Sequence, residues 1–323
     1  MKISLAHGNG AEETAQLIDT VFLKYFRNKF TRMEDAAVLP FSGERLAFTS
    51  DSFVVKPLFF PGADIGRLAV CGTVNDLLTT GGKPLYLSAS FILEENLDTD
   101  VLEKVAGSMR EAADEAGVYI VTGDTKVIEG NGGMFINTAG LGIAGDLSLG
   151  NIADGDAILA SGNLGDHHAC ILSRRMGISN GIKSDAAPLV DLVDALMKGG
   201  ITVHGLRDIT RGGLATVLNE AALLCGLSAV IDESALPVSQ EVGGFCKILG
   251  LDPLYMGNEG KMLVVVPQRF SAMALELMRK SRYGENAAII GRFTQGRGVS
   301  LRTRLGGERN LPPLSGEGLP RIC

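Results

Sequence analysis

The chain has 323 residues, a length that fits two domains better than one. Hydrophobic residues make up 46% of it and charged residues 21%, which is typical of a globular protein with enough apolar material for a core. The net charge is −7, aromatic residues reach only 6%, and Lys and Arg form no cluster, so we do not expect binding to nucleic acid.

Targeting signals are not evident in the sequence. The first ten residues show no long apolar run with a small-residue cleavage site, and no apolar stretch approaches the roughly 18 residues of a membrane span. The five cysteines include no Cys-x-x-Cys pair, and four of them lie in apolar, helix-like patterns, which is typical of buried thiols in a reducing compartment. We therefore expect a cytoplasmic protein that contacts no membrane.

The first half of the chain alternates between helix and strand patterns. Apolar spacing predicts, in chain order, a helix over 11–27, a strand over 45–55, a helix over 64–82, a strand over 84–93, a helix over 99–117 and strands over 118–124 and 133–145. Residues 147–156 are polar and predict turns, so we place a domain boundary near residue 150.

The second half begins again with an apolar strand over 157–162 and a helix over 167–177. Further helices are predicted over 188–198, 212–226, 239–249 and 268–282, and strands over 227–232, 261–267, 286–293 and 298–303. This mixed order predicts an α+β protein with mixed sheets and two domains, over 1–150 and 151–304.

The last 19 residues, 305–323, are interrupted by Pro and Gly too often for a helix or a central strand. We expect a flexible tail, which fully extended would reach on the order of 50 Å at about 3.3 Å per residue. The tail ends in Cys323. A lipid anchor is not expected there, because prenylation requires a Cys four residues from the end.

Four acidic residues of the first half stand beside apolar segments: Asp35, Asp51, Asp76 and Asp124. Each alone is typical of a turn or a helix cap. Together they offer the hard oxygen ligands with which Mg²⁺ is shared between carboxylates and nucleotide phosphates. Lys126, two residues after Asp124, is a candidate point charge for a transferring phosphoryl group.

Two glycine-rich turns, at 6–10 and 161–169, could offer backbone N–H groups to phosphate. Neither continues into the Gly-Lys-Ser/Thr of a Walker A loop. In the second turn, Asp166-His167-His168 resembles the metal ligands of a phosphoesterase family, but the other metal motifs of that family are absent. We therefore favour Gly162, Gly165, Asp166 and His167 as residues at a helix start that faces phosphate.

Two later segments leave alternatives open. "DITRGG" (208–213), which contains Arg211, is either a capped helix start or a place where the backbone approaches a ligand. Glu259 lies in the glycine-bracketed "GNEGK" (257–261) and is either a surface turn residue or a base presented on a loop.

Six segments together resemble the superfamily of aminoimidazole ribonucleotide synthetase, selenophosphate synthetase and thiamin-monophosphate kinase. They are "EDAAV", "TSDSF", "VNDLLTTGGKP", "GDTKV", "DITRGGL" and "GNEGK". The whole chain, with its terminal Pro-Arg-Ile-Cys, resembles one branch of that superfamily, the HypE carbamoyl dehydratases of hydrogenase maturation.

The resemblance implies an ATP- and Mg²⁺-dependent dehydration of an S-carbamoyl group on Cys323 to a thiocyanate. The carbamoyl group would come from the carbamoyltransferase HypF, and the cyanide would pass to the HypC–HypD complex for the [NiFe]-hydrogenase. It also implies a homodimer formed through the first domains, with nucleotide bound near the shared surface.

Site residues can be assigned by matching positions. The resemblance implies Mg²⁺–phosphate coordination by Asp51, Asp76 and Asp124 with support from Asp35, charge stabilisation by Lys126, proton acceptance by Glu259, and nucleotide contacts from Gly162, Gly165, Asp166, His167 and Arg211. Two other functions remain open on the sequence: phosphoryl transfer to a diffusible substrate, and a carrier or scaffold without catalysis.

Overall fold

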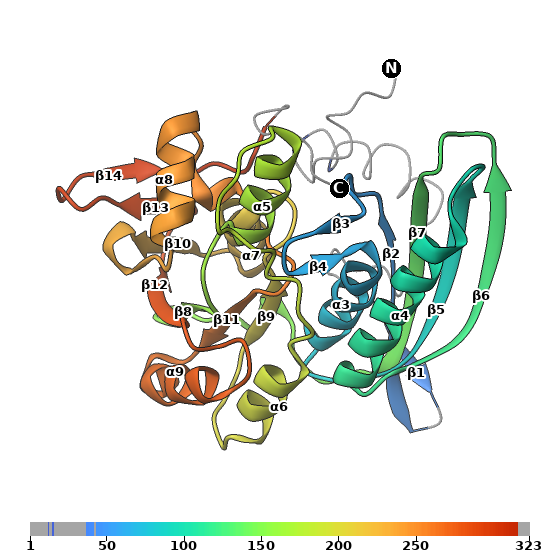
Figure 1. Cartoon of the computed structure of the whole chain (residues 1–323). Coiled ribbons are helices and arrows are strands. Elements are labelled where there is room, and N and C mark those ends of the chain that lie inside the picture. The colour runs from blue at the N-terminus through green and yellow to red at the C-terminus, as the bar shows by residue number, and fades with distance from the viewer. Residues whose placement is uncertain (1–11, 13–14, 16–36, 42, 316–323) are drawn as a thin grey trace.

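The computed structural model describes residues 12, 15, 37–41 and 43–315 (Figure 1). The glycine-rich turn at 6–10, nearly all of the helix predicted over 11–27, and both Asp35 and Cys323 lie outside the described residues. Where the structure is described, no helix is long and apolar enough to cross a membrane.

The first sheet has five strands in the order β1-β2-β7-β5-β6, and all neighbouring pairs are antiparallel except β5–β6. Its strands are β1 (Ala37–Phe41), β2 (Glu44–Phe53), β5 (Lys83–Glu94), β6 (Tyr119–Ile128) and β7 (Met134–Ile143). The two helices that pack on it are α3 (Ile65–Leu78) and α4 (Thr99–Ala116), and a small ribbon of β3 (Phe59–Phe60) and β4 (Ala63–Asp64) leads into α3.

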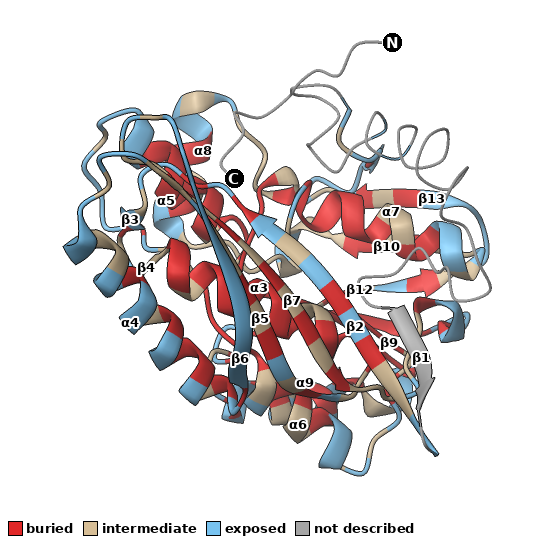
Figure 2. Cartoon of the chain, turned by 90° about the vertical axis from the view of Figure 1, so that its right-hand side faces the viewer, coloured by how far each residue is buried: buried red, intermediate tan, exposed pale blue. Residues whose placement is uncertain are grey.

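Among the described residues, helices cover only one face of the first sheet (Figure 2). In β7, buried residues alternate with partly exposed ones, as expected for a strand with one face toward a core. Helix α4 buries a single stripe that includes Val105 and Met109, and ends at Gly117 in the left-handed conformation. Helix α3 is buried along almost its whole length, because it lies between this sheet and the second half of the chain.

The second sheet has seven strands in the order β14-β13-β10-β12-β8-β11-β9. They are β8 (Ala157–Ala160), β9 (Gly205–Asp208), β10 (Ser228–Asp232), β11 (Met262–Val266), β12 (Ala288–Thr294), β13 (Gly298–Arg302) and β14 (Glu308–Asn310). The helices of this half are α5 (Asp166–Arg175), α6 (Val190–Lys198), α7 (Gly213–Cys225), α8 (Gln240–Leu249) and α9 (Ser271–Lys280).

The neighbouring interior strands β8 and β11 are buried on both faces, which explains their uninterrupted apolar sequences. One face, with Ile158 and Leu263, packs in a core that includes α7. The opposite face, with Leu159 and Val264, packs in a core that also contains residues of α3 and α4. The two halves of the chain therefore share one continuous apolar core.

The mixed sheets confirm the predicted α+β class with two domains. The limits 1–150, 151–304 and 305–323 remain our proposal. The sequence did not predict β1, β3, β4, β9 or β14, and β6 is longer than the strand predicted over 118–124, with every residue exposed. The first residues of the predicted tail thus belong to the second sheet, where β14 pairs with β13.

Candidate functional site

Glu259 lies in a buried loop where the two domains meet. The Nδ2 of Asn75 in α3 donates to the carbonyl oxygens of Ala187 (3.0 Å) and Glu259 (3.4 Å), so the first domain holds this loop of the second. Burial raises the pKa of Glu259 well above its ordinary value, and the nearby charges of Asp51 and Asp208 raise it further. A raised pKa makes a carboxylate a stronger proton acceptor, which suits the role of a general base.

Asp51 of β2 and Asp76 of α3 lie on facing elements of the first domain. The hydroxyl of Thr49 donates to Asp76 Oδ2 at 2.8 Å. Asp51 Oδ2 lies 3.7 Å from the position that a Cβ on Gly72 would take, one turn before Asp76. That Cβ would also lie 2.9 Å from the ring of Phe53, so only glycine lets β2 approach the helix this closely. The glycine therefore allows β2 to bring Asp51 close to α3, one turn from Asp76.

Asp208, the last residue of β9, adds a fourth carboxyl group; it belongs to "DITRGG" but was not assigned to the site from the sequence. Its side chain is buried, and burial raises its pKa; the charge of Asp51 acts in the same direction, while Arg207 and Arg211 oppose it. Arg211 opposes the raised pKa of Glu259 as well. The available signal was an Asp at a strand end directly before "ITRGG".

Two glycines hold the loop that carries Arg211 against the loop before Glu259. Gly212 and Gly213 both have positive φ, 75° and 62°. A Cβ on Gly213 would lie 2.5 Å from the carbonyl oxygen of Leu254, and one on Gly257 would lie 3.1 Å from that of Thr210. This close approach of backbones is what the glycines of both motifs provide.

The oxygen donors fit a Mg²⁺ ion that is shared with phosphates, but not a cage of protein carboxylates. Among the residues that the structure describes, no three His, Cys, Asp or Glu side chains form a group that could hold a metal ion. In nucleotide sites Mg²⁺ is usually bound through one or two carboxylates together with substrate phosphates. Asp51 and Asp76 offer such a pair, and a cation beside them would relieve the repulsion that raises the pKa values of Glu259 and Asp208.

The structure places Asp124 and Lys126 away from this group, contrary to the shared cage that we predicted. Asp51 is paired in register with Thr138, and the Thr138 side chain faces α3. Asp124 is paired with Ser90, and its side chain lies on the opposite face of the sheet. Its strand, β6, is three strands away from β2. Lys126 Nζ bonds both oxygens of Asp124, at 2.9 and 2.7 Å, on the exposed edge strand β6. A single chain therefore does not bring Asp51 and Asp124 to one ion.

The loop after β8 is held by protein contacts where we predicted phosphate. The Gly165 N–H donates to Asn258 Oδ1 at 2.7 Å. His167 is fully buried, with its Nδ1 2.8 Å from the Ser184 hydroxyl, and burial lowers its pKa to about 4. Its ring packs edge-on against Phe60. The Gly165 N–H and the His167 imidazole are thus occupied by contacts within the protein.

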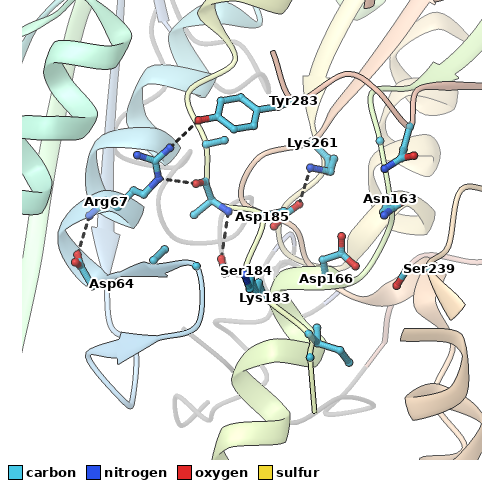
Figure 3. Close-up of a pocket in the computed structure, with 18 of the residues that line it drawn as sticks. Asp64, Arg67, Asn163, Asp166, Lys183, Ser184, Asp185, Ser239, Lys261 and Tyr283 are labelled. Atoms are coloured by element: carbon cyan, nitrogen blue, oxygen red, sulfur yellow. Dashed lines mark hydrogen bonds and ion pairs between the residues drawn. The ribbon is translucent and has the colours of Figure 1, made fainter. Parts of the chain in front are cut away.

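Gly162 and Asp166 instead line a cavity of about 1010 Å³ between the two domains (Figure 3). Burial and the charge of Asp185 raise the pKa of Asp166 to about 6. Lys261 lies over Gly162, where an added Cβ would be 2.9 Å from its Cε, and its ammonium group is 3.4 Å from Asp185. Asp185 also lies close enough to raise the pKa of Glu259, so it stands between the cavity and the Glu259 loop.

The last described residues are hydrogen-bonded to the second domain next to the loop that carries Arg211. Leu311 is fully buried against the α7 core, and its carbonyl oxygen accepts from Asn219 Nδ2 at 2.8 Å. The hydroxyl of Tyr255 donates to the Pro312 carbonyl oxygen at 2.9 Å. The Leu314 N–H then donates to the hydroxyl of Thr216, in the first turn of α7, at 3.3 Å. The chain is thus directed toward the start of α7.

Two family models match most of the chain. Residues 33–144 match the N-terminal domain of AIR synthase related proteins, and residues 153–304 match their C-terminal domain. Carbamoyl dehydratase HypE of Rhodobacter capsulatus is 45% identical, with 100% of this chain and 98% of the relative covered. The chain belongs to the HypE family. Carbamoyl dehydratase HypE of Escherichia coli is 43% identical, with 99% of each chain covered.

Solved HypE structures share the whole architecture. HypE in a HypE–HypF complex superposes with a TM-score of 0.88 at 45% identity, covering 92% of this chain and 99% of that one. HypE in complex with ATP gives a TM-score of 0.83 at 45% identity, with both chains fully covered. Thiamine monophosphate kinase from Aquifex aeolicus, at 21% identity, shares the fold with a TM-score of 0.71, covering 94% of this chain and 99% of that one.

The residues predicted for the HypE site thus fall into three groups, and their roles remain predictions. Asp51, Asp76, Arg211 and Glu259 surround the domain junction, Asp124 and Lys126 lie on the open face of the first sheet, and Gly162, Gly165, Asp166 and His167 belong to the loop beside the cavity.

Proposed function

We propose that this chain catalyses the ATP-dependent dehydration of a carbamoyl group carried on the sulfur of Cys323, giving a thiocyanate for hydrogenase maturation. The hydrogen bond from the Leu314 N–H to the Thr216 hydroxyl carries the proposal, because it lies beside the loop that holds Arg211 near Glu259. The last described residues thus run toward the buried base. Membership of the HypE family supports the same reaction.

The remaining chain is long enough to deliver the sulfur. From Leu314 to Cys323 nine residues remain, and at about 3.3 Å each they span up to roughly 30 Å. A group on such a short tether is presented at about millimolar effective concentration without a separate binding step. The segment can therefore serve both the Glu259 site and a protein that loads the sulfur.

The chemistry needs ATP because the carbamoyl oxygen is a poor leaving group. The carbamoyl oxygen attacks the γ-phosphorus, the bond to the bridging oxygen of ADP breaks, and one of the two N–H protons is released to solvent as the O-phosphorylated intermediate forms. A base then removes the remaining N–H proton, the C–O bond breaks, and the electron pairs left on nitrogen complete the C≡N bond. The products are protein thiocyanate, ADP and inorganic phosphate, and both nitrogen-bound protons have left.

We assign the proton-accepting step to Glu259, because its raised pKa strengthens its affinity for a proton. Arg211 offers a positive charge beside the same group. Asp51 and Asp76 would hold the Mg²⁺ ion, which when bound neutralises phosphate charge. Asp208 offers a further carboxylate at this junction.

We also propose a homodimer formed through the open face of the first sheet. Large apolar side chains lie exposed there, among them Phe48, Tyr86 and Tyr119, with exposures of 44%, 44% and 70%. Asp124 and Lys126 lie on this face too. A two-fold pair that sets β6 of one copy opposite β2 of the other would bring them to the partner's nucleotide site.

The domain roles and partners belong to the same proposal. The first domain, 1–150, would bind ATP and dimerise, the second, 151–304, would carry Glu259, and 305–323 would carry the thiol. The carbamoyl group would be received from HypF, since a HypE relative has been solved with HypF, and the cyanide would pass to HypC–HypD in the cytoplasm.

Intact-mass spectrometry tests the proposal after incubation with HypF, carbamoyl phosphate and ATP. We expect a carbamoyl adduct on Cys323 that loses the mass of water when ATP and Mg²⁺ are present. Cys323→Ser should form no adduct, and Glu259→Gln should accumulate the adduct without losing water. Glu276→Gln, a matched change at an exposed carboxylate paired with Lys280, should react normally. ATP turnover on a diffusible substrate by Cys323→Ser would instead favour a different phosphoryl transfer.

A further inference from the structure

Asp185 receives the backbone N–H of Glu259. Its Oδ1 lies 3.0 Å from the Glu259 nitrogen. The two segments are pressed together here, because a Cβ on Gly260 would lie 1.9 Å from the Asp185 carbonyl oxygen. The Ala187 N–H donates to the Glu259 carbonyl oxygen at 3.4 Å, so residues 185–187 bond both the N–H and the carbonyl group of Glu259.

Asp185 lines the cavity between the domains, and its other carboxylate oxygen, Oδ2, lies toward Lys261 (Figure 3). The side chain is only 4% exposed, and Oδ2 makes no hydrogen bond. The ammonium group of Lys261 lies 3.4 Å from it and is itself held by the Gly260 carbonyl oxygen at 3.0 Å. A buried carboxylate needs such a countercharge. The positive charge of Lys261 thus allows the Asp185 carboxylate to be buried next to the Glu259 backbone.

We propose that Asp185 is a positioning residue for the dehydration step: Oδ1 fixes the backbone of Glu259 and hence the direction of its carboxyl group, while Lys261 balances the charge. The inference rests on the proposed base role of Glu259. In the dehydration step Asp185 acts through Glu259, because its bonded oxygen meets the Glu259 main chain and its other oxygen faces Lys261.

Two substitutions separate positioning from folding. Asp185→Ala removes the acceptor, and we expect single-turnover loss of water from the carbamoyl adduct to slow by about 10- to 100-fold, as small misplacements of catalytic groups do. The Kd for Mg²⁺–ATP should change less than about twofold, because Asp185 is not among the proposed nucleotide ligands. Asp185→Asn keeps a carbonyl oxygen for the Glu259 N–H and should restore most of the rate.

A double-mutant cycle with Glu259→Gln decides whether Asp185 acts through Glu259. We expect Asp185→Ala to add no further slowing in the Glu259→Gln background. Asp191→Ala removes another Asp-to-backbone bond, the one to the Arg282 N–H at 2.8 Å, and serves as the control that should keep the full rate. Equal slowing by Asp185→Ala in both backgrounds, or an Asp185→Asn variant as slow as Asp185→Ala, would overturn the assignment.

The same experiment distinguishes this inference from the proposed function. If Glu259→Gln alone dehydrates the adduct at the full rate, the base role fails, and the effect of Asp185 must be assigned elsewhere. If Glu259→Gln is slow but Asp185→Ala is not, the base role stands and the positioning role fails. Should Asp185→Ala not fold, as circular dichroism would show, Asp185→Glu displaces the acceptor while keeping its charge and should reproduce the slow rate.

Discussion

Glu259 is a carboxyl group that the fold keeps from water and places beside other carboxyl groups. Burial is the largest cause of its raised pKa, and the charges of Asp51 and Asp208 come next. In the unfolded chain a Glu has a pKa near 4.3. Above that pH the folded state therefore binds more protons at this position than the unfolded state, and stability falls as pH rises through the raised pKa.

This linkage predicts a pH-dependent gain from Glu259→Gln. Gln stays neutral, so the metal-free variant should unfold at a higher temperature than the parent chain at pH 8, with a smaller difference at pH 5. Thermal unfolding followed by circular dichroism in EDTA measures both. Glu276→Gln, at an exposed position, should show no gain that grows with pH. A difference between Glu259→Gln and the parent that stays constant from pH 5 to pH 8 would contradict the prediction.

Sequence reasoning found the residues that carry a motif of their own and missed those defined by a contact. Glu259 was recognisable from its bracketing glycines, and the structure shows those glycines at close backbone approaches. Asp185 has no such pattern, because its role arises from meeting the Glu259 N–H across a tertiary contact. His167 shows the reverse case: a helix-start pattern predicted a ligand, but burial beside Ser184 and Phe60 holds the ring.

At the level of elements, the end of the chain shows where composition misleads. Frequent Pro and Gly predicted an irregular tail from residue 305, yet β14 pairs with β13 and Leu311 is buried behind it. A strand of three residues needs little intrinsic preference when it adds to the edge of an existing sheet and a neighbouring side chain is buried. The anchored strand and Leu311 therefore fix the point from which the terminal segment leaves the second domain.

We predict that two truncations differ sharply in stability. A chain ending at Ser315 keeps β14 and Leu311, so its free energy of unfolding should lie within about 0.5 kcal/mol of the full chain. A chain ending at Arg304 loses both and should be destabilised by about 2–5 kcal/mol, the range for emptying the site of a buried Leu. Urea unfolding by circular dichroism measures this, with Leu311→Ala in the full chain as a matched test of the apolar anchor. Equal urea midpoints for the two truncations would contradict the anchor.

On the scale of the whole molecule, the site exists because two domains share a core. Arg67 of α3 donates to the Ala186 carbonyl oxygen (2.8 Å) and to the Tyr283 hydroxyl (3.2 Å), and pairs with Glu115 at 3.0 Å. Such contacts set the distance between Asp51 and Asp208, which sequence patterns alone do not give. The α+β class was predictable from element order, whereas the faces on which Asp51 and Asp124 lie depend on register and required the structure.

The open face of the first sheet predicts a catalytic site that is shared between two copies of the chain. If Lys126 of one copy serves Glu259 of the other, mixing Lys126→Ala chains with Glu259→Gln chains creates heterodimers with one intact site each. Random exchange should then restore about a quarter of the parent dehydration rate, although neither variant alone is active. Intact-mass kinetics on the mixture measure this.

Adding Tyr86→Glu to both chains places charges in the apolar face and should abolish the restoration, with sedimentation showing monomers. Leu223→Glu, at an exposed position on α7 of the second domain, is the matched control and should leave dimers and restoration intact. If the mixture stays inactive while the chains sediment as dimers, Lys126 of one copy does not serve the Glu259 site of the other.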